Sequence, residues 1–235
     1  MRTAFLALGI VALVGPRGIH AQSVDDAAAY VAMVVSPVAA VSPIVLPYMT
    51  GTKQAGLGFA AKYGRMSLGD IGSTNTFLAD FTGPAGGGSW GLEAGYLGTT
   101  CQGCTGNFMA GLHLEGPLAK AGSTTGTLFT LGMQGTVGFA KPNNGSVWAA
   151  GVTMPTALSV TAGRVEIVPF VSPGVGVGMV AADSRSQTGY RFNVGAGVGV
   201  ANVAPGLGIT ASAERVLIDG GRTVFGLGVS WNRLR

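Results

Sequence analysis

The chain has 235 residues, of which 41 are glycine, 47% are hydrophobic and 10% are charged. Soluble domains carry about 25% charged residues, so this composition excludes an ordinary soluble domain, and the high hydrophobic content excludes a disordered chain. The formal net charge of +4 comes without a cluster of lysine and arginine, so we expect no nucleic-acid partner.

The first residues have the pattern of a secretory leader. Met1 and Arg2 give a short positive start, residues 4–14 form an apolar stretch, and the small Ala21 stands at the expected cleavage point. The sequence therefore predicts a signal peptide over residues 1–21 and export of the rest of the chain.

Residues 22–53 are predicted to form a periplasmic lead-in. Residues 27–35 are apolar and follow two aspartates, an arrangement that favours the start of a helix. Pro37, Pro43 and Pro47 would end such a helix before it could span a membrane. A short helix and an extended segment both remain open for this part of the chain.

From residue 55 onward, apolar residues alternate with glycine and small polar residues. Residues 190–200 show the pattern, with tyrosine, phenylalanine, valine and alanine on one parity and mainly glycine on the other. A period of two indicates a β-strand, because successive side chains leave the backbone on opposite faces. A second face of glycine and small polar residues suits a crowded, wet interior, as in a barrel in lipid. A closed barrel is also the only non-helical structure that satisfies its backbone inside a bilayer.

The alternation divides into ten segments, and all but the second reach the length of about 9–11 residues that a tilted membrane strand needs. The segments are 55–64, 76–82, 89–98, 107–115, 125–139, 146–160, 164–180, 189–203, 206–217 and 222–233. The sequence therefore predicts an all-β fold, an antiparallel up-and-down transmembrane β-barrel of about ten strands over residues 54–235. Eight strands remain possible if the second segment and one neighbour are loops.

Tryptophan and tyrosine favour the two interfaces of a membrane, so their positions test the predicted register. Four of them fall at the outer ends of predicted strands and two at the inner ends. The outer group is Tyr63, Tyr96, Trp148 and Tyr190, and the inner group is Trp90 and Trp231. We interpret these residues as two aromatic belts.

The last strand carries a further pattern, glycine followed by an apolar and then an aromatic residue, at Gly226, Val229 and Trp231. Together with the alternation, this pattern resembles the small outer-membrane barrels of the opacity-protein and porin-like superfamily, over roughly residues 54–235. The resemblance implies the outer membrane of a Gram-negative-type bacterium, with membrane lipid as a partner. It also implies that the last strand is presented to the outer-membrane insertion machinery.

Most ionisable residues of the predicted strands share the parity that faces the lumen. They are Lys62, Asp80, Glu93, His113, Glu115, Glu166, Arg191 and Glu214. A charge on the lipid face at mid-membrane costs about 2–4 kcal/mol for lysine or arginine, whereas an inward charge can be hydrated or paired. These residues could form a network of salt bridges that fills a narrow lumen, or they could line a selective pore.

Catalysis is a third reading of the inward residues. His113 with Glu93 or Glu115 could orient a base, but a nucleophilic mechanism needs a serine within reach of the histidine, and no serine lies close to it in the same strand. We therefore expect no catalytic residue and no cofactor.

Cys101 and Cys104 fall in the predicted loop between the third and fourth strands. Two thiols are half of a zinc site, and the sequence has no matching pair, so no metal is expected. Export to an oxidising compartment favours a local disulfide that closes a small ring.

These observations predict an integral outer-membrane β-barrel with a polar, largely filled lumen, either structural or a narrow pore for small solutes. The alternative is a surface adhesin whose loops contact a partner. A lipid-modifying barrel hydrolase fits the residues less well.

Overall fold

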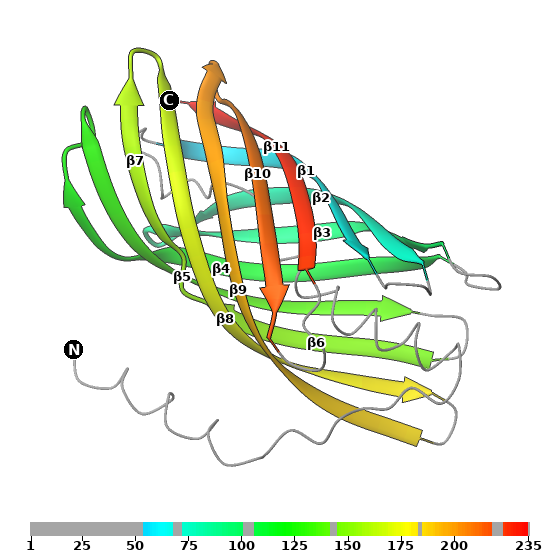
Figure 1. Cartoon of the computed structure of the whole chain (residues 1–235). Helices are drawn as coiled ribbons and strands as arrows, with labels where there is room; N and C mark the ends of the chain where they lie inside the picture. Colours follow the sequence, from blue (N-terminus) through cyan, green and yellow to red (C-terminus); the bar gives the residue numbers. More distant parts are fainter. Residues whose placement is uncertain are drawn as a thin grey trace.

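The computed structural model describes residues 54–67, 72–100, 106–141, 145–182, 185–217 and 223–234. Within these ranges all regular structure is β-strand (Figure 1). No helix among them is both long and apolar enough to cross a membrane. The predicted signal peptide, the predicted lead-in and the Cys101–Cys104 pair lie outside the described residues.

Eleven strands follow one another along the described chain. They are β1 (Gln54–Ser67), β2 (Ser73–Ala85), β3 (Gly88–Thr99), β4 (Asn107–Gly122), β5 (Thr127–Lys141), β6 (Gly145–Thr153), β7 (Thr156–Ala162), β8 (Val165–Ala182), β9 (Arg185–Ala204), β10 (Leu207–Val216) and β11 (Thr223–Leu234).

The strands form a closed antiparallel barrel. Except for β6 and β7, strands that follow one another in the chain pair with each other, and the pairing of β1 with β11 closes the barrel. Strands β6 and β7 lie end to end and share one position in the wall, because both pair with β5 on one side and β8 on the other. The barrel therefore has ten positions, which confirms the predicted all-β barrel of ten strands and makes the eight-strand alternative wrong.

The division between β6 and β7 differs from the single strand predicted over residues 146–160. Pro155 has no backbone N–H and falls between the two strands. The ladder nevertheless continues through the break, since Met154 N donates to Pro173 O at 2.9 Å and Gly132 N donates to Pro155 O at 2.8 Å. The interruption is therefore local and leaves the wall closed.

The second predicted strand, the shortest of the ten, is a full member of the wall. Strand β2 pairs along its length with β1 and β3. The largest difference in length is in β4, which was predicted to end at residue 115 and continues to Gly122. A register shift between Pro117 and Ala119 absorbs the proline, and pairing with β5 then resumes.

The stagger of the strands sets the width of the barrel. From Val168 on β8, the pairing partners lead through β9, β10, β11 and each following strand to Val180, twelve residues further along β8. With a rise of about 3.3 Å per residue and about 4.8 Å between strands, this stagger gives a tilt of about 40° and a backbone diameter of about 20 Å.

Tight turns join the strands at the end of the barrel where β1 begins. At the turn between β9 and β10, Pro205 is followed by Gly206, whose φ is +77°. Proline then glycine with positive φ is the pattern of a type II turn. These two central residues explain why the predicted segments 189–203 and 206–217 are separate strands.

Candidate functional site in the barrel interior

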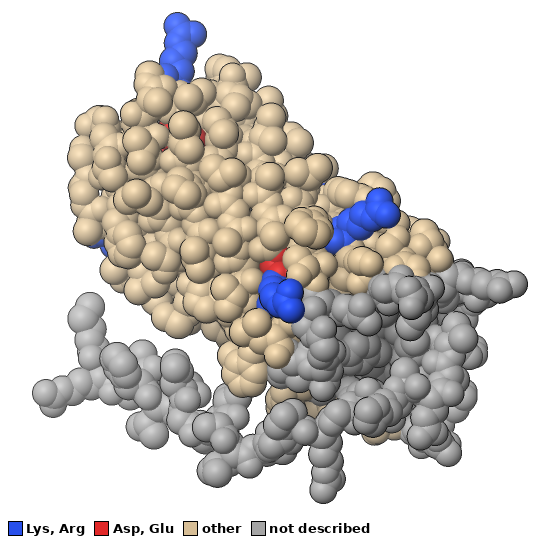
Figure 2. All heavy atoms as spheres, in the orientation of Figure 1, with Lys and Arg blue, Asp and Glu red and all other residues tan. Residues whose placement is uncertain are grey.

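The two faces of the wall have opposite character. On β11, the outward Phe225 and Leu227 are 62% and 57% exposed, whereas the alternating Gly226 and Gly228 are buried. Figure 2 shows one side of the outer surface, where a broad area of uncharged residues carries few charged side chains. Polar and charged side chains are instead buried inside. They include Lys62, Asp80, Glu93, His113, Glu115, Gln134, Thr136, Thr153, Glu166, Asn193 and Glu214.

Three of these residues form an ion cluster on adjacent strands. Asp80 on β2 and Glu93 on β3 are directly opposite each other in the ladder, and Lys62 comes from β1. The Lys62 ammonium donates a hydrogen bond to Glu93 and lies 3.2 Å from Asp80 Oδ2. All three side chains are buried, so the lysine compensates two carboxylates that water does not reach.

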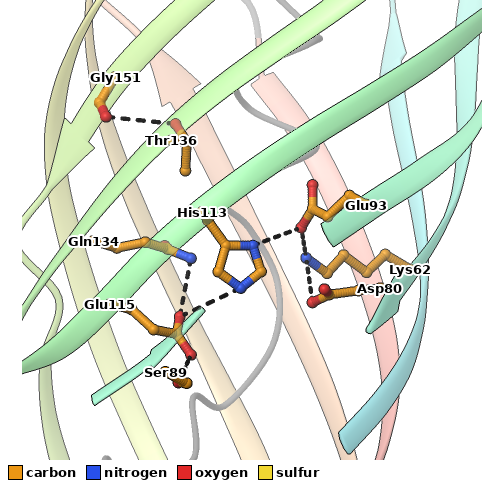
Figure 3. A network of polar contacts seen from close by, with 9 residues as sticks. All are labelled: Lys62, Asp80, Ser89, Glu93, His113, Glu115, Gln134, Thr136 and Gly151. Atoms are coloured by element: carbon orange, nitrogen blue, oxygen red, sulfur yellow. Dashed lines mark hydrogen bonds and ion pairs between the residues drawn. The ribbon is translucent and has the colours of Figure 1, made fainter. Parts of the chain in front are cut away.

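His113 on β4 connects this cluster to a second carboxylate. Its Nδ1 lies 3.4 Å from Glu93 Oε1, and its Nε2 lies 4.0 Å from Glu115 Oε2 (Figure 3). The imidazole is 2% exposed. The ring therefore stands between two acidic side chains in the interior.

Neutral side chains hold Glu115 in place. Ser89 Oγ donates to Glu115 Oε1 at 2.7 Å, and Gln134 Nε2 donates to Glu115 Oε2 at 3.1 Å. Nearby on β5, Thr136 Oγ1 donates to the backbone oxygen of Gly151 at 3.5 Å. The network thus extends from β1 to β5, and Figure 3 shows its side chains directed toward one another.

A glycine makes room for the histidine. A Cβ atom placed on Gly91, which is opposite His113 in the ladder, would lie 2.2 Å from the imidazole Cε1 and Nε2. No side chain fits at that distance, so the alternation of glycine with apolar residues has a specific use at this position.

The remaining inward residues of the sequence analysis belong to strands β8, β9 and β10. Glu166 on β8 accepts a hydrogen bond from Ser159 Oγ at 2.9 Å, and Glu214 on β10 is buried on the opposite part of the wall. Arg191 belongs to β9 and is opposite Gly176, but its side chain is not among those described.

Ser89 and Gln134 were not among the predicted site residues. They share the inward parity of the charged residues, so the alternation that selected Glu115 also contained them. They were missed because only ionisable residues were considered as candidates. The neutral residues that orient a buried charge are as important to its geometry as its ionic partners.

The residues of the predicted aromatic belts lie on the outer face. Tyr96, Trp148, Tyr190 and Trp231 are about half exposed, and Tyr63 and Trp90 are less so. Tyr63 donates a hydrogen bond through its hydroxyl to Asn75 Oδ1 at 2.7 Å, and its ring packs against Phe77.

A closed antiparallel wall with an even number of positions, an apolar outside and a charged inside has one physical explanation. Its exposed apolar face must contact lipid, and its interior keeps the charges away from that lipid. The chain forms a membrane-spanning β-barrel.

No protein-family model and no curated protein matches the chain. Among solved structures, it is similar to Ail, the attachment invasion locus protein of Yersinia pestis, with 10% identity and a TM-score of 0.37, over 77% of this chain and 99% of that one. The transport unit of the autotransporter AIDA-I from Escherichia coli has 11% identity and a TM-score of 0.43, over 90% of this chain and 99% of that one.

The outer membrane protein Omp33 of Acinetobacter baumannii has 10% identity and a TM-score of 0.31, over 77% of this chain and 99% of that one. At these identities and TM-scores the similarities say nothing about what this chain binds or transports. The fold described above therefore rests on the strand pairing of the chain itself.

Proposed function

We propose that the chain is an integral outer-membrane barrel whose own side chains restrict the lumen to small solutes. The observation that carries this proposal is the network of Lys62, Asp80, Glu93, His113 and Glu115, which five adjacent strands direct into the interior together with the supporting Gln134. The wall keeps these charges away from lipid, and their side chains narrow the lumen that the strands enclose.

The width of the barrel supports a filled lumen. Barrels of about eight strands have interiors that side chains can fill, and ten strands enclose only slightly more space. Wide aqueous channels belong to barrels of about 16–18 strands. A network of long side chains reaching inward from half of the wall therefore leaves room for a small solute rather than for a large one.

The arrangement of the polar groups does not suit nucleophilic catalysis. In a serine triad, the histidine lies between the nucleophile and the acid. Here the acid, Glu115, lies between Ser89 and His113, because the Ser89 hydroxyl donates a hydrogen bond to the Glu115 carboxylate. We infer a non-enzymatic role for this cluster.

The apolar outer face of the barrel indicates that membrane lipid is its immediate partner. We infer that the exposed tyrosine and tryptophan residues lie at the two membrane interfaces, since their rings favour the headgroup level. The last strand, with Gly226, Val229 and Trp231, is the segment we expect the outer-membrane insertion machinery to bind during assembly.

Conductance in planar lipid bilayers tests the proposed restriction. We expect small current steps or none from the wild-type protein, and steps at least several-fold larger from His113→Ala, which removes the side chain at the centre of the network. Phe225→Ala, on the lipid face, is the matched control and should conduct like the wild type. Correct folding of each variant is checked by its heat-modifiable mobility on gels.

Two results would contradict the proposal. Large steps from the wild type, equal to those from His113→Ala, would show that the network does not narrow the lumen. Silence from both proteins would show that the network does not control permeation, and it would favour the alternative of a surface-interaction barrel.

A further inference from the structure

Three potential metal ligands converge on one point of the interior. Asp80, Glu93 and His113 come from β2, β3 and β4, and one potential ligand atom from each lies within 4.8 Å of the other two. The geometry points to a binding site for a divalent transition-metal ion, with these three side chains as its ligands and Lys62 as the cation that occupies the site when the metal is absent.

The spacing of two ligand atoms suits coordination better than a hydrogen bond. Between His113 Nδ1 and Glu93 Oε1 the distance is 3.4 Å. Hydrogen bonds from nitrogen to oxygen have a typical length of about 2.9–3.0 Å. In a tetrahedral zinc site with ligand bonds of about 2.0–2.2 Å, neighbouring ligand atoms are about 3.4 Å apart. These two side chains therefore already form one edge of such a site.

Unused hydrogen-bonding capacity at the same point is an independent observation. Neither ring nitrogen of His113 makes a hydrogen bond to a described residue, and the same is true of Asp80 Oδ1. The imidazole is 98% buried, being 2% exposed. Polar atoms at such positions nearly always have a partner. An ion held by His113, Glu93 and Asp80 would satisfy both the histidine nitrogen and the aspartate oxygen.

Residues behind the histidine supply the support that metal-binding histidines commonly have. A ligating imidazole usually donates its second N–H to a carboxylate, which fixes the ring. If Nδ1 binds the ion, Nε2 faces Glu115 Oε2 at 4.0 Å, and a small movement of either side chain brings them into contact. Ser89 and Gln134 already orient that carboxylate.

Lys62 determines how strongly an ion is held. Its ammonium contacts both carboxylates, so a metal must displace it from Asp80 and Glu93. A nearby positive charge also repels the ion, and this repulsion is greater in a buried site than in water. The mixture of one imidazole and two carboxylates favours Zn²⁺ or Co²⁺ over Mg²⁺ or Ca²⁺, which bind oxygen ligands.

Titration of the folded, full-length protein in detergent micelles with Co²⁺ tests this inference. The visible absorption of Co²⁺ reports its coordination, and added Zn²⁺ should displace it. We expect one saturable site in the wild type. Lys62→Met should bind at least tenfold more tightly, because it keeps all three ligands and removes the competing cation.

Ligand variants should have the opposite effect. His113→Gln and Asp80→Asn should each weaken Co²⁺ binding by at least tenfold. Glu115→Gln, behind the histidine, should weaken it by about 10–100-fold. Glu166→Gln is the matched control, because Glu166 is a buried carboxylate on β8 that accepts a hydrogen bond from Ser159 and is not one of the three proposed ligands. Its binding should equal that of the wild type.

Absence of a saturable cobalt spectrum in both the wild type and Lys62→Met would overturn the inference. Equal affinity of His113→Gln and the wild type would also overturn it, since binding would then be elsewhere on the chain. Gel mobility before and after heating confirms that each variant is folded. Failure of this test leaves the expected conductances unchanged, because a metal-free network still occupies the lumen.

Discussion

Replacing Lys62 with methionine should destabilise the barrel strongly. The side chains of Lys62, Asp80 and Glu93 are 6%, 4% and 1% exposed, so the substitution leaves two carboxylates facing each other without water. At 3.2 Å and an effective dielectric constant of about 20, one such ion pair is worth about 5 kcal/mol of attraction. The cost of burying the lysine offsets part of this, and breaking a buried pair costs about 3–5 kcal/mol in practice. We expect a loss within that range.

Urea unfolding of the protein in lipid vesicles, in the presence of a chelator, measures this loss. Tryptophan fluorescence and gel mobility follow the transition. Lys120→Met is the matched control, because Lys120 is exposed near the end of β4 and its replacement should change the free energy of unfolding by less than about 0.5 kcal/mol.

A second variant separates lost charge compensation from lost packing. Adding Asp80→Asn and Glu93→Gln to Lys62→Met removes all three charges, so it should recover most of the lost stability. A loss below about 1 kcal/mol for Lys62→Met alone would refute the reasoning, because the two carboxylates would then have another source of compensation.

Two further substitutions test the packing and the orientation of the wall. Gly91→Ala should lower the free energy of unfolding by about 1–3 kcal/mol, because its Cβ would overlap the His113 ring. Gly135→Ala is the control and should have little effect, because no atom lies within 4 Å of the added Cβ. Equal effects would contradict the close contact of Gly91 with the His113 ring. Leu227→Arg, on the outer face of β11, should lower the free energy of unfolding in vesicles by about 2–4 kcal/mol. Leu217→Arg, just beyond the end of β10, should lower it by about 0–1 kcal/mol. A larger loss for Leu217→Arg would mean that Leu227 does not face the lipid core.

The wall of the barrel was predictable because alternation is a local property. The outward Phe225 and Leu227 and the inward Gly226 and Gly228 can be assigned from neighbouring residues alone. Pro155 was a signal for the break between β6 and β7, since proline cannot donate a hydrogen bond to the ladder. The alternation on both sides of Pro155 nevertheless indicated one continuous strand.

The contacts inside the barrel could not be predicted in the same way. Alternation says that Asp80 and Glu93 face inward, but their direct opposition depends on where the turn between β2 and β3 falls. That turn uses Gly86 and Gly87, both with positive φ, and moving it by one residue would change every pair of the two strands. The contact of His113 with Glu93 depends in addition on the register between β3 and β4.

The stagger of the strands has a consequence for the depth of the network. A pairing partner on the next strand lies about 1.2 residue lengths nearer the end of the barrel where β1 finishes, because ten steps around the barrel give a displacement of twelve residues. The pairing partners of Gln134 are Glu115, then Ser89, then Pro84, which is four residues from Asp80 along β2 and nearer the turn end. The three steps from Pro84 to Gln134 move about 3.6 residue lengths toward the end where β1 finishes, and Asp80 lies four residues from Pro84 in the same direction. Gln134 and Asp80 therefore lie at almost the same depth.

Lys62 meets the same level within about one residue, because it is opposite Leu78, two residues from Asp80. The displacement between paired residues on successive strands is therefore offset by the positions of the network residues along their strands. The network forms a thin layer perpendicular to the barrel axis. A solute moving along the barrel axis would encounter its charges together, in one short step of the path.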